Sequence, residues 1–436
     1  MGKSKSMIDD KTVAVIGGAG HVGLGMCLVL AEAGHGVFGI DINQQANDSI
    51  MAGRMPFMEE HGQEYLERAL ANGRLSMTTD LVEVQKADVV VVVLGTPIDE
   101  NLNPRFDGLK ALFSSLAPHL RRGQLIILRS TVSPGTTERA KRMLERQLGW
   151  RCGEDFHLVF APERVLQGHA IEELESLPQL VGAFDDVSWE ASRSFFATYV
   201  RNEIIRLTPV EAEIGKLVTN MYRYLTFAFA NEVYFIADQW GANSNKVIDA
   251  INKNYPRVNV PRPGPNVGGP CLFKDGYFLI ERIPFPELIS SSFKINEGMT
   301  AQIAMKIDQM PEVQKVGILG LTFKANSDDT RNSLSYKLKK QLDDGSHDVV
   351  CVDPYVEGHK DFSVLKGAEC VVLMTPHHEF ADLVQVANAI DNPDCLVIDI
   401  WGFWLPMRYE SDNGVFRLSD ALSSAGQQVL GQGVAK

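Results

Sequence analysis

Apolar residues come in short runs along the first half of the chain, and longer amphipathic segments separate these runs. Residues 21–34 have the length and spacing of a helix that ends at a glycine. Runs rich in Val, Ile and Leu, which are typical of buried parallel strands, lie at 12–18, 36–41, 89–97, 125–132 and 157–163. Strands that alternate with helices predict an α/β fold built on a doubly wound parallel sheet.

The pattern changes at residue 208. Apolar residues at spacings of three and four from 208 to 241 predict one long helix. Proline and glycine cluster at 256–270, which indicates a loop, and helical patterning then returns as far as about residue 310. The middle of the chain is therefore expected to be helical.

A second alternating unit follows the helical middle, with apolar runs at 313–324, 348–356, 369–376 and 396–402. The whole chain thus predicts two Rossmann-like doubly wound domains that are joined by a long central helix and a helical middle domain. The expected domain boundaries are 1–207, 208–310 and 311–436.

Charge and cysteine content narrow the possible partners. The net charge is -13, which disfavours nucleic acid and anionic membrane surfaces as partners. The longest apolar run, 87–95, is too short to span a bilayer, and the first residues lack the apolar core of a signal peptide. The six cysteines are scattered without a CxxC pair, so we expect neither disulfides nor a metal site, and a cytoplasmic location.

A glycine-rich turn follows the first predicted strand. Gly18, Gly20 and Gly23 have the GxGxxG spacing, which lets a pyrophosphate approach the backbone at a helix N-terminus. Asp41 ends the next strand, where a carboxylate binds a ribose 2′-hydroxyl and repels a 2′-phosphate, so the motif favours NAD over NADP. An ordinary glycine-rich turn would not need this order of strand, glycines, helix and acid. The same turn contributes the candidate cofactor contacts His21 and Val22.

Other polar residues also follow predicted strands. Thr96 lies in "GTP", Thr131 in "STVSPGTT", and Glu163 in "APERVLQG". Ligands of doubly wound sheets bind beyond the carboxyl ends of the strands, so the two threonines are candidates to line the nicotinamide site. Simple turn chemistry explains either threonine equally well.

The stretch "GGPCLFKD" supplies a candidate nucleophile. Cys271 comes at the start of a predicted helix, whose field and a nearby lysine favour a thiolate. Asp275 is four residues further on and can share a face with it, as can Lys216 and Asn220 on the long helix. The alternatives are a buried core thiol and solvated helix charges. A thiol beside a nicotinamide indicates aldehyde oxidation through a thioester.

Taken together, these motifs resemble the UDP-glucose/GDP-mannose dehydrogenase family. The resemblance runs from about Lys11 to about Leu418 and rests on eight motifs in order. They are "GGAGHVGLGM", "GTP", "STVSPGTT", "APERVLQG", "EAEIGKLVTNMYRYLTFAFANE", "GGPCLFKD", "GLTFKANSDDTRNS" and "DIWG". The family implies an NAD-dependent, four-electron oxidation of a nucleotide sugar at C6, from alcohol to carboxylate through a thioester.

The resemblance also implies roles for the motif residues. Cys271 corresponds to the nucleophile, while Lys216 and Asn220 stabilise oxyanion charge. Asp275 positions water or takes a proton, and Glu163 assists thioester hydrolysis. The resemblance also implies that Glu163, Arg164, Lys216 and Asn220 contact the substrate. Thr131 would help to hold the water and the nicotinamide.

The second half of the chain carries further implied contacts. Lys324 would face the nucleotide sugar and Arg331 the cofactor, while the bend at Gly268 would let the substrate approach Cys271. Arg257 resembles an arginine that reaches the substrate site of a neighbouring subunit, which implies a homodimer built on the long helix. Each residue also has a simpler alternative. Lys324 could be an exposed loop lysine, Arg331 could pair with Asp328 or Asp329, and Arg257 could be a loop charge.

The identity of the sugar is less determined. Arg164 and Val165 resemble the branch that acts on UDP-N-acetylhexosamines, whereas Lys274 and Asp275 are typical of UDP-glucose and GDP-mannose members. We favour a UDP-N-acetylhexosamine such as UDP-N-acetylmannosamine, with UDP-glucose and then GDP-mannose as alternatives, and a product used for a surface polysaccharide. Two other classes stay open, a two-electron hydroxyacid dehydrogenase and a catalytically silent NAD-binding regulator.

The adjacent histidines of "TPHHEF", His377 and His378, have no accompanying cluster of metal ligands. We expect them to be solvated or to cap a helix.

Overall fold

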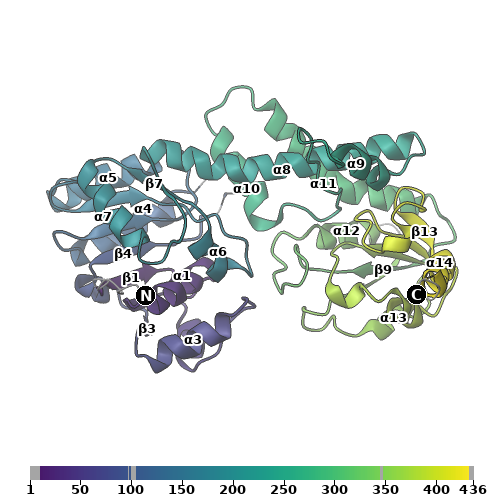
Figure 1. The fold of residues 1–436 in the computed structure, drawn as a ribbon, viewed down its shortest axis with the longest axis horizontal. Helices are drawn as coiled ribbons and strands as arrows, with labels where there is room; N and C mark the ends of the chain where they lie inside the picture. Colours follow the sequence, from purple (N-terminus) through teal and green to yellow (C-terminus); the bar gives the residue numbers. More distant parts are fainter. Residues whose placement is uncertain (1–9, 97, 100–104, 344–346, 432–436) are drawn as a thin grey trace, which may run out of the picture. The chain divides into compact units, whose positions relative to one another are not determined.

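The computed structural model describes residues 10–96, 98–99, 105–343 and 347–431. The expectation of a signal-free N-terminal segment falls on the first nine residues, which lie outside this set. The chain divides into two compact units (Figure 1), one formed by the residues up to Thr219 with Tyr277–Ile283, the other by Asn220–Gly276 with the residues from Pro284 on. Within the described ranges, no helix is both long and apolar enough to cross a membrane.

The first unit is built on an eight-stranded sheet with the order β3-β2-β1-β4-β5-β6-β7-β8. Only the β6–β7 pair is antiparallel. The strands are β1 Thr12–Ile16, β2 Gly36–Ile40, β3 Leu75–Thr78, β4 Val89–Val92, β5 Leu125–Leu128, β6 His157–Phe160, β7 Gln179–Ala183 and β8 Ile204–Leu207. The predicted doubly wound sheet is confirmed, with β1 between β2 and β4 as in a dinucleotide-binding domain.

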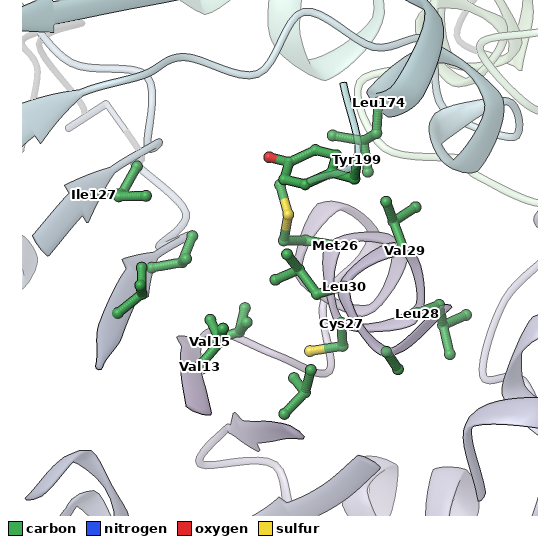
Figure 2. Packing of buried hydrophobic residues seen from close by; sticks show 14 of the residues in the cluster. Val13, Val15, Met26, Cys27, Leu28, Val29, Leu30, Ile127, Leu174 and Tyr199 are labelled. Carbon is green, nitrogen blue, oxygen red and sulfur yellow. The ribbon is translucent and has the colours of Figure 1, made fainter. Parts of the chain in front are cut away.

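Helices cover both faces of this sheet. They are α1 His21–Glu32, α2 Gln44–Met51, α3 Gly62–Ala71, α4 Asp107–Leu116, α5 Thr136–Leu148, α6 Ala170–Ser176 and α7 Asp186–Phe196, with short 3-10 helices at Leu81–Lys86 and Ala117–His119. Successive residues of β1 enter opposite cores, because side chains alternate along a strand. Val13 and Val15 pack with Met26 and Leu30 of α1 (Figure 2), whereas Ala14 belongs to the cluster with α4 and α5.

The predicted long helix is α8, Pro209–Gln239. It is followed by α9 Ser244–Asn252, α10 Gly269–Ile280 and α11 Glu287–Asp308. The buried apolar residues of α8 recur at helical spacing and include Leu217, Met221 and Tyr224.

The second sheet has five strands in the order β10-β9-β11-β12-β13. It is parallel except for its last pair. The strands are β9 Lys315–Leu319, β10 Asp348–Val352, β11 Cys370–Leu373, β12 Leu396–Ile398 and β13 Val415–Arg417. The helices of this part are α12 Leu334–Asp343, α13 Leu383–Ile390 and α14 Leu418–Gly431, with short 3-10 helices at Phe362–Leu365, His378–Phe380 and Leu405–Met407. Ile303 and Ile307 of α11 share a core cluster with Val316 and Ile318 of β9.

One buried asparagine ties the helical part of the second unit to its sheet. Asn413 precedes β13 with a φ of 44°. Its Oδ1 accepts a hydrogen bond from the Ser244 N–H at the start of α9, and its Nδ2 donates to the Tyr234 carbonyl of α8. Both α8 and α9 therefore depend on one side chain of the second sheet domain.

We predict that Asn413→Ala lowers the free energy of unfolding by about 2–4 kcal/mol, because it leaves the buried Ser244 N–H without its acceptor. Urea titration followed by circular dichroism measures the change. Asn202→Ala is the matched control, since Asn202 makes an exposed hydrogen bond to Ser176. Equal effects of the two variants would contradict the proposed role of Asn413 in holding α8 and α9 to the second sheet.

Candidate active site

The glycine turn leaves the N-terminus of α1 open. The helix begins after Gly20, which provides no side-chain cap, and its first turn contains no acidic residue. A Cβ on Gly23 would lie 1.9 Å from the Gly17 carbonyl oxygen, so only glycine allows the turn to pack this closely. Because the helix N-terminus carries unpaired N–H groups and a partial positive charge, it can accept a pyrophosphate.

Asp41 directly follows β2 and lies against the same turn. Its Oδ2 accepts a hydrogen bond from the Ala19 N–H at 3.1 Å, and its Oδ1 accepts one from the Asn43 N–H at 3.0 Å. The carboxylate is therefore held beside the pyrophosphate turn, where it can receive ribose hydroxyls. These residues fit a dinucleotide with an unmodified 2′-hydroxyl.

Two residues near this turn were missed by the sequence reasoning. Ile42 is 95% exposed, an unusual state for a large apolar side chain beside a candidate ligand site. The second is Phe57, whose ring stacks on that of His21 with the centroids 4.1 Å apart. The predicted contact residue Val22 is half-buried. An apolar residue directly after the acid of the second strand is the signal that could have singled out Ile42.

The two threonines that follow predicted strands, Thr96 and Thr131, both lie in the first unit. Thr96 follows β4 and is buried, and Thr131 follows β5 and is half-buried. Thr96 lines a small surface hollow together with Val132 and Ser133. The buried Ser133 hydroxyl has no hydrogen-bond partner within the described part of the chain, so a polar ligand group could bind there.

Glu163 and Arg164 follow β6 and are half-buried. Glu163 accepts a hydrogen bond from the Val165 N–H through Oε1. The Arg164 guanidinium donates to the Pro178 carbonyl, and burial lowers its pKa. The carbonyl of Pro162 is fixed by the Gln179 amide at 3.1 Å. The predicted substrate contacts of Glu163 and Arg164 remain predictions.

The second unit brings Asn220 and Asp275 together. The Asn220 Nδ2 donates to Asp275 Oδ2 at 2.6 Å, and the Lys274 Nζ lies 3.0 Å from Asp275 Oδ1. Both Asn220 and Asp275 are buried. Lys216, one turn before Asn220 on α8, is also buried. The sequence predicted this spacing on the helix but not the contact of Asn220 with Asp275.

Cys271 is the third residue of α10 and is exposed. It is therefore not a core thiol, unlike the buried Cys27, Cys351, Cys370 and Cys395. Bidentate hydrogen bonding to Asp329 raises the pKa of Arg331, and negative charge on Cys271 acts in the same direction. Arg331 thus forms the ion pair with Asp329 that the sequence offered as the alternative to a cofactor contact, and its charge also interacts with Cys271. The predicted contact of Arg331 with the cofactor remains a prediction.

The bend before Cys271 needs glycine. Gly268 has a φ of 101°, and a Cβ there would lie 2.6 Å from the Tyr224 ring of α8. A Cβ on Gly269 would lie 2.4 Å from the ring of Phe323, in the segment after β9. The bend therefore lets the start of α10 approach both α8 and the segment that carries Lys324.

His377 corrects an expectation from the sequence. Instead of being solvated, it is fully buried, while His378 is exposed. Its Nδ1 accepts the Asn326 N–H at 3.0 Å, so its Nε2 carries the proton and lies 3.0 Å from Asp353 Oδ2. Burial opposes ionisation of Asp353, but the bond from His377 and backbone N–H groups lower its pKa. The ring therefore fixes the turn two residues after Lys324.

Arg257 lies in the exposed loop after α9. Its guanidinium lies over the Tyr255 ring, 4.6 Å from the centroid, and donates to the Tyr255 hydroxyl. Its predicted contact with a neighbouring subunit remains a prediction. Within the ranges that the structure describes, no group of three or more His, Cys, Asp or Glu side chains could hold a metal ion.

Comparison with known proteins identifies the family. Three domain descriptions of the UDP-glucose/GDP-mannose dehydrogenase family match the chain, the NAD binding domain at residues 11–200, the central domain at 210–297 and the UDP binding domain at 317–406. The chain belongs to this family. It is an NAD-dependent nucleotide-sugar dehydrogenase, and its C-terminal Rossmann-like domain matches the family's UDP binding domain.

Individual relatives cover most of both chains. The UDP-N-acetyl-D-mannosamine dehydrogenase of Pyrococcus horikoshii is 32% identical over 84% of this chain and 90% of its own. The NDP-N-acetyl-D-galactosaminuronic acid dehydrogenase of Ralstonia nicotianae is 31% identical over 92% and 98%. The solved structure of the Pyrococcus horikoshii enzyme has a TM-score of 0.81 at 31% identity, covering 87% of this chain and 93% of that one. A UDP-glucose dehydrogenase from Pyrobaculum islandicum has a TM-score of 0.80 at 26% identity, covering 87% and 93%.

We predict that Gly20→Ala weakens NAD binding without unfolding the protein. A Cβ there would meet only the Gly17 carbonyl, at an ordinary 3.5 Å, but it would occupy the space through which the pyrophosphate approaches the backbone. The KM for NAD should rise about 10-fold or more, and the Tm should stay within a few degrees. Gly23→Ala is the contrasting variant and should lower the Tm. An unchanged KM in Gly20→Ala would argue against this placement of the cofactor.

Proposed function

We propose that this enzyme oxidises the C6 alcohol of a UDP-N-acetylhexosamine to a carboxylate, and that UDP-N-acetylmannosamine is its substrate. The observation that carries the chemistry is the exposed Cys271, one helical turn before the buried Asn220–Asp275 pair. The choice of sugar is supported by the names of the Pyrococcus horikoshii relatives and of the Staphylococcus aureus structure, a UDP-N-acetyl-mannosamine dehydrogenase with a TM-score of 0.77. The product is a nucleotide-linked uronic acid, a suitable precursor for a surface polysaccharide.

In the proposed reaction, NAD held at the turn of Gly18, Gly20 and Gly23 beside Asp41 would supply the oxidant, and each of two NAD molecules bound in turn would take one hydride. The alcohol becomes an aldehyde with loss of one proton, and the Cys271 sulfur adds to the aldehyde carbon. The second oxidation gives a thioester, which water cleaves to release the carboxylate and the thiol. One alcohol, two NAD and one water therefore yield one carboxylate, two NADH and three protons.

The other candidate residues have separate proposed tasks. Lys216 and Asn220 stabilise negative charge on the C6 oxygen. Asp275, whose two oxygens are bonded to Asn220 and Lys274, orients the amide and takes a proton. Glu163 assists hydrolysis of the thioester, with Thr131 holding the attacking water.

A second substrate, UDP-glucose, is favoured by two observations. The Lys274–Asp275 pair resembles UDP-glucose members, and the UDP-glucose dehydrogenase from Pyrobaculum islandicum has almost the same TM-score as the UDP-D-ManNAc dehydrogenase. We rank it second because the relatives that share more than 30% identity are named for N-acetylated sugars.

Substrate and stoichiometry can be measured in one experiment. NADH formed per sugar consumed is followed with UDP-glucose, GDP-mannose and the UDP-linked N-acetyl derivatives of glucosamine, galactosamine and mannosamine. We expect about two NADH per sugar, as a thioester route requires, with the largest kcat/KM on UDP-N-acetylmannosamine. One NADH per sugar would contradict the four-electron reaction, and a preference for UDP-glucose would contradict the proposed sugar.

The nucleophile has its own test. Cys271→Ala should abolish formation of the carboxylate because the thioester cannot form. Cys152→Ala is the matched control, since Cys152 is half-buried and its thiol has a pKa that burial raises to about 11. It should retain normal turnover. Carboxylate production by Cys271→Ala at the rate of the unaltered enzyme would refute the scheme.

We propose that two copies associate through α8. Its exposed face carries large apolar residues at four-residue spacing, which are Val210, Ile214, Val218 and Tyr222. An uninterrupted apolar stripe on a surface helix is typical of an interface. The resemblance of Arg257 to an arginine that reaches a neighbouring subunit supports this association. The free thiols of the described cysteines support a reducing, cytoplasmic location.

Tyr222→Glu should convert the dimer to a monomer, because it places a charge at the most exposed residue of the apolar stripe. Sedimentation equilibrium reports the mass directly. Val187→Glu, at a similarly exposed position on α7, is the control and should leave the mass unchanged. If the unaltered enzyme sediments as a monomer, the proposed interface does not exist.

A further inference from the structure

The carboxylate of Glu213 is buried at the N-terminus of another helix. Glu213 lies in the second turn of α8 and is 1% exposed. Its Oε2 accepts the Gly135 N–H at 2.5 Å, and its Oε1 accepts both the N–H of Thr137, at 2.7 Å, and its hydroxyl, at 2.6 Å. All three donors belong to the first turn of α5 or to the residue before it.

This arrangement replaces an ordinary helix cap. Gly135 precedes α5 with a φ of 86° and offers no side chain to its first turn, so the capping acceptor comes from α8. Burial raises the pKa of Glu213, whereas the bonds from Thr137 and Gly135 act against that rise. The open helix end favours a negative charge, which explains why a carboxylate tolerates this depth. Two helices distant in sequence are thereby joined through three hydrogen bonds.

The joined elements carry two residues of the proposed reaction. Lys216 follows Glu213 by three residues, which is about one turn of α8. Thr131 lies four residues before Gly135, in the segment between β5 and α5. The other end of that segment is also fixed, because the Leu94 N–H donates to the Ser130 hydroxyl at 2.8 Å and the Arg129 N–H to the Val92 carbonyl at 2.9 Å. The bond to Glu213 therefore completes the restraint on the segment that contains Thr131.

We infer that Glu213 is a positioning residue, which holds Lys216 and Thr131 in the register that oxidation and thioester hydrolysis need. The inference rests on the proposed function of these two residues. Glu213 itself has no role in the chemistry, since its carboxylate is occupied by α5. A shift of α8 against α5 would displace the ammonium and the hydroxyl relative to each other, and displacements of about 1 Å in an active site can reduce turnover about 100-fold.

Glu213→Gln tests the inference, because the amide has nearly the same size but presents an NH2 group where one acceptor is needed. We expect kcat to fall about 10-fold or more, with the KM for NAD changed less than about twofold. Thr137→Val removes only the hydroxyl bond and should reduce kcat less, while Thr137→Ser keeps the donor and should restore it. The control is Glu211→Gln, which should turn over normally because Glu211 is exposed and accepts its hydrogen bonds from Thr208, the residue before α8.

All variants are assayed well below their Tm, with rates given per folded protein. A wild-type kcat in folded Glu213→Gln, or a loss that disappears after correction for unfolded protein, overturns the inference. If Glu213→Gln does not fold, the threonine pair decides: equal kcat values for Thr137→Val and Thr137→Ser also overturn it. The stoichiometry of NADH in the unaltered enzyme is measured in parallel, so failure of the proposed four-electron reaction is seen independently of these variants.

Discussion

Burial of the Asp275 carboxylate is the constraint on which the candidate site depends. At 1% exposure, an ionised carboxylate is stable only when both oxygens have partners. Asn220 of α8 and Lys274 of α10 supply them. The bond to Asn220 fixes α10 against α8, so it also determines where Cys271, one turn earlier on α10, stands beside the long helix. Removing Lys274 would leave the carboxylate without its cation, and removing Asn220 would leave one of its oxygens without a donor.

The loops that hold the other candidate residues follow the same rule. Segments beyond the carboxyl ends of strands lack the ladder hydrogen bonds of the sheet, and a buried polar side chain from another part of the chain helps to fix each of three such segments. His377 holds the turn after Lys324, Gln179 holds the carbonyl before Glu163, and Glu213 holds the segment after Thr131. Such fully paired polar contacts make loop geometry specific, which a site that must place several groups requires.

The sequence predicted features that depend on residues near one another in the chain, and it missed features that depend on contacts between distant residues. Most strands and α8 were predicted because their signals, apolar runs and three-to-four spacing, are local. The sequence reasoning missed the short strands β3, β7, β8 and β13. The glycine turn and Asp41 were found because chain order alone brings them to one edge of the sheet. The bond between Asn220 and Asp275 joins positions 55 residues apart, and no local pattern marks it. His377 was misjudged for the same reason, since its burial depends on three loops that meet only in the folded unit.

The same contacts bear on the two residues that resemble different branches of the family. The sequence motifs that separate the acetylated from the non-acetylated branches differ at Arg164 and Lys274. In the structure Arg164 donates to the Pro178 backbone and Lys274 pairs with Asp275, so each side chain has a partner within the protein. A residue that is already bonded in this way acts on a substrate mainly through the loop or helix that it holds in place. Under the proposed function, exchanging Arg164 or Lys274 alone is therefore expected to disturb the segment that each side chain holds before it changes the preferred sugar.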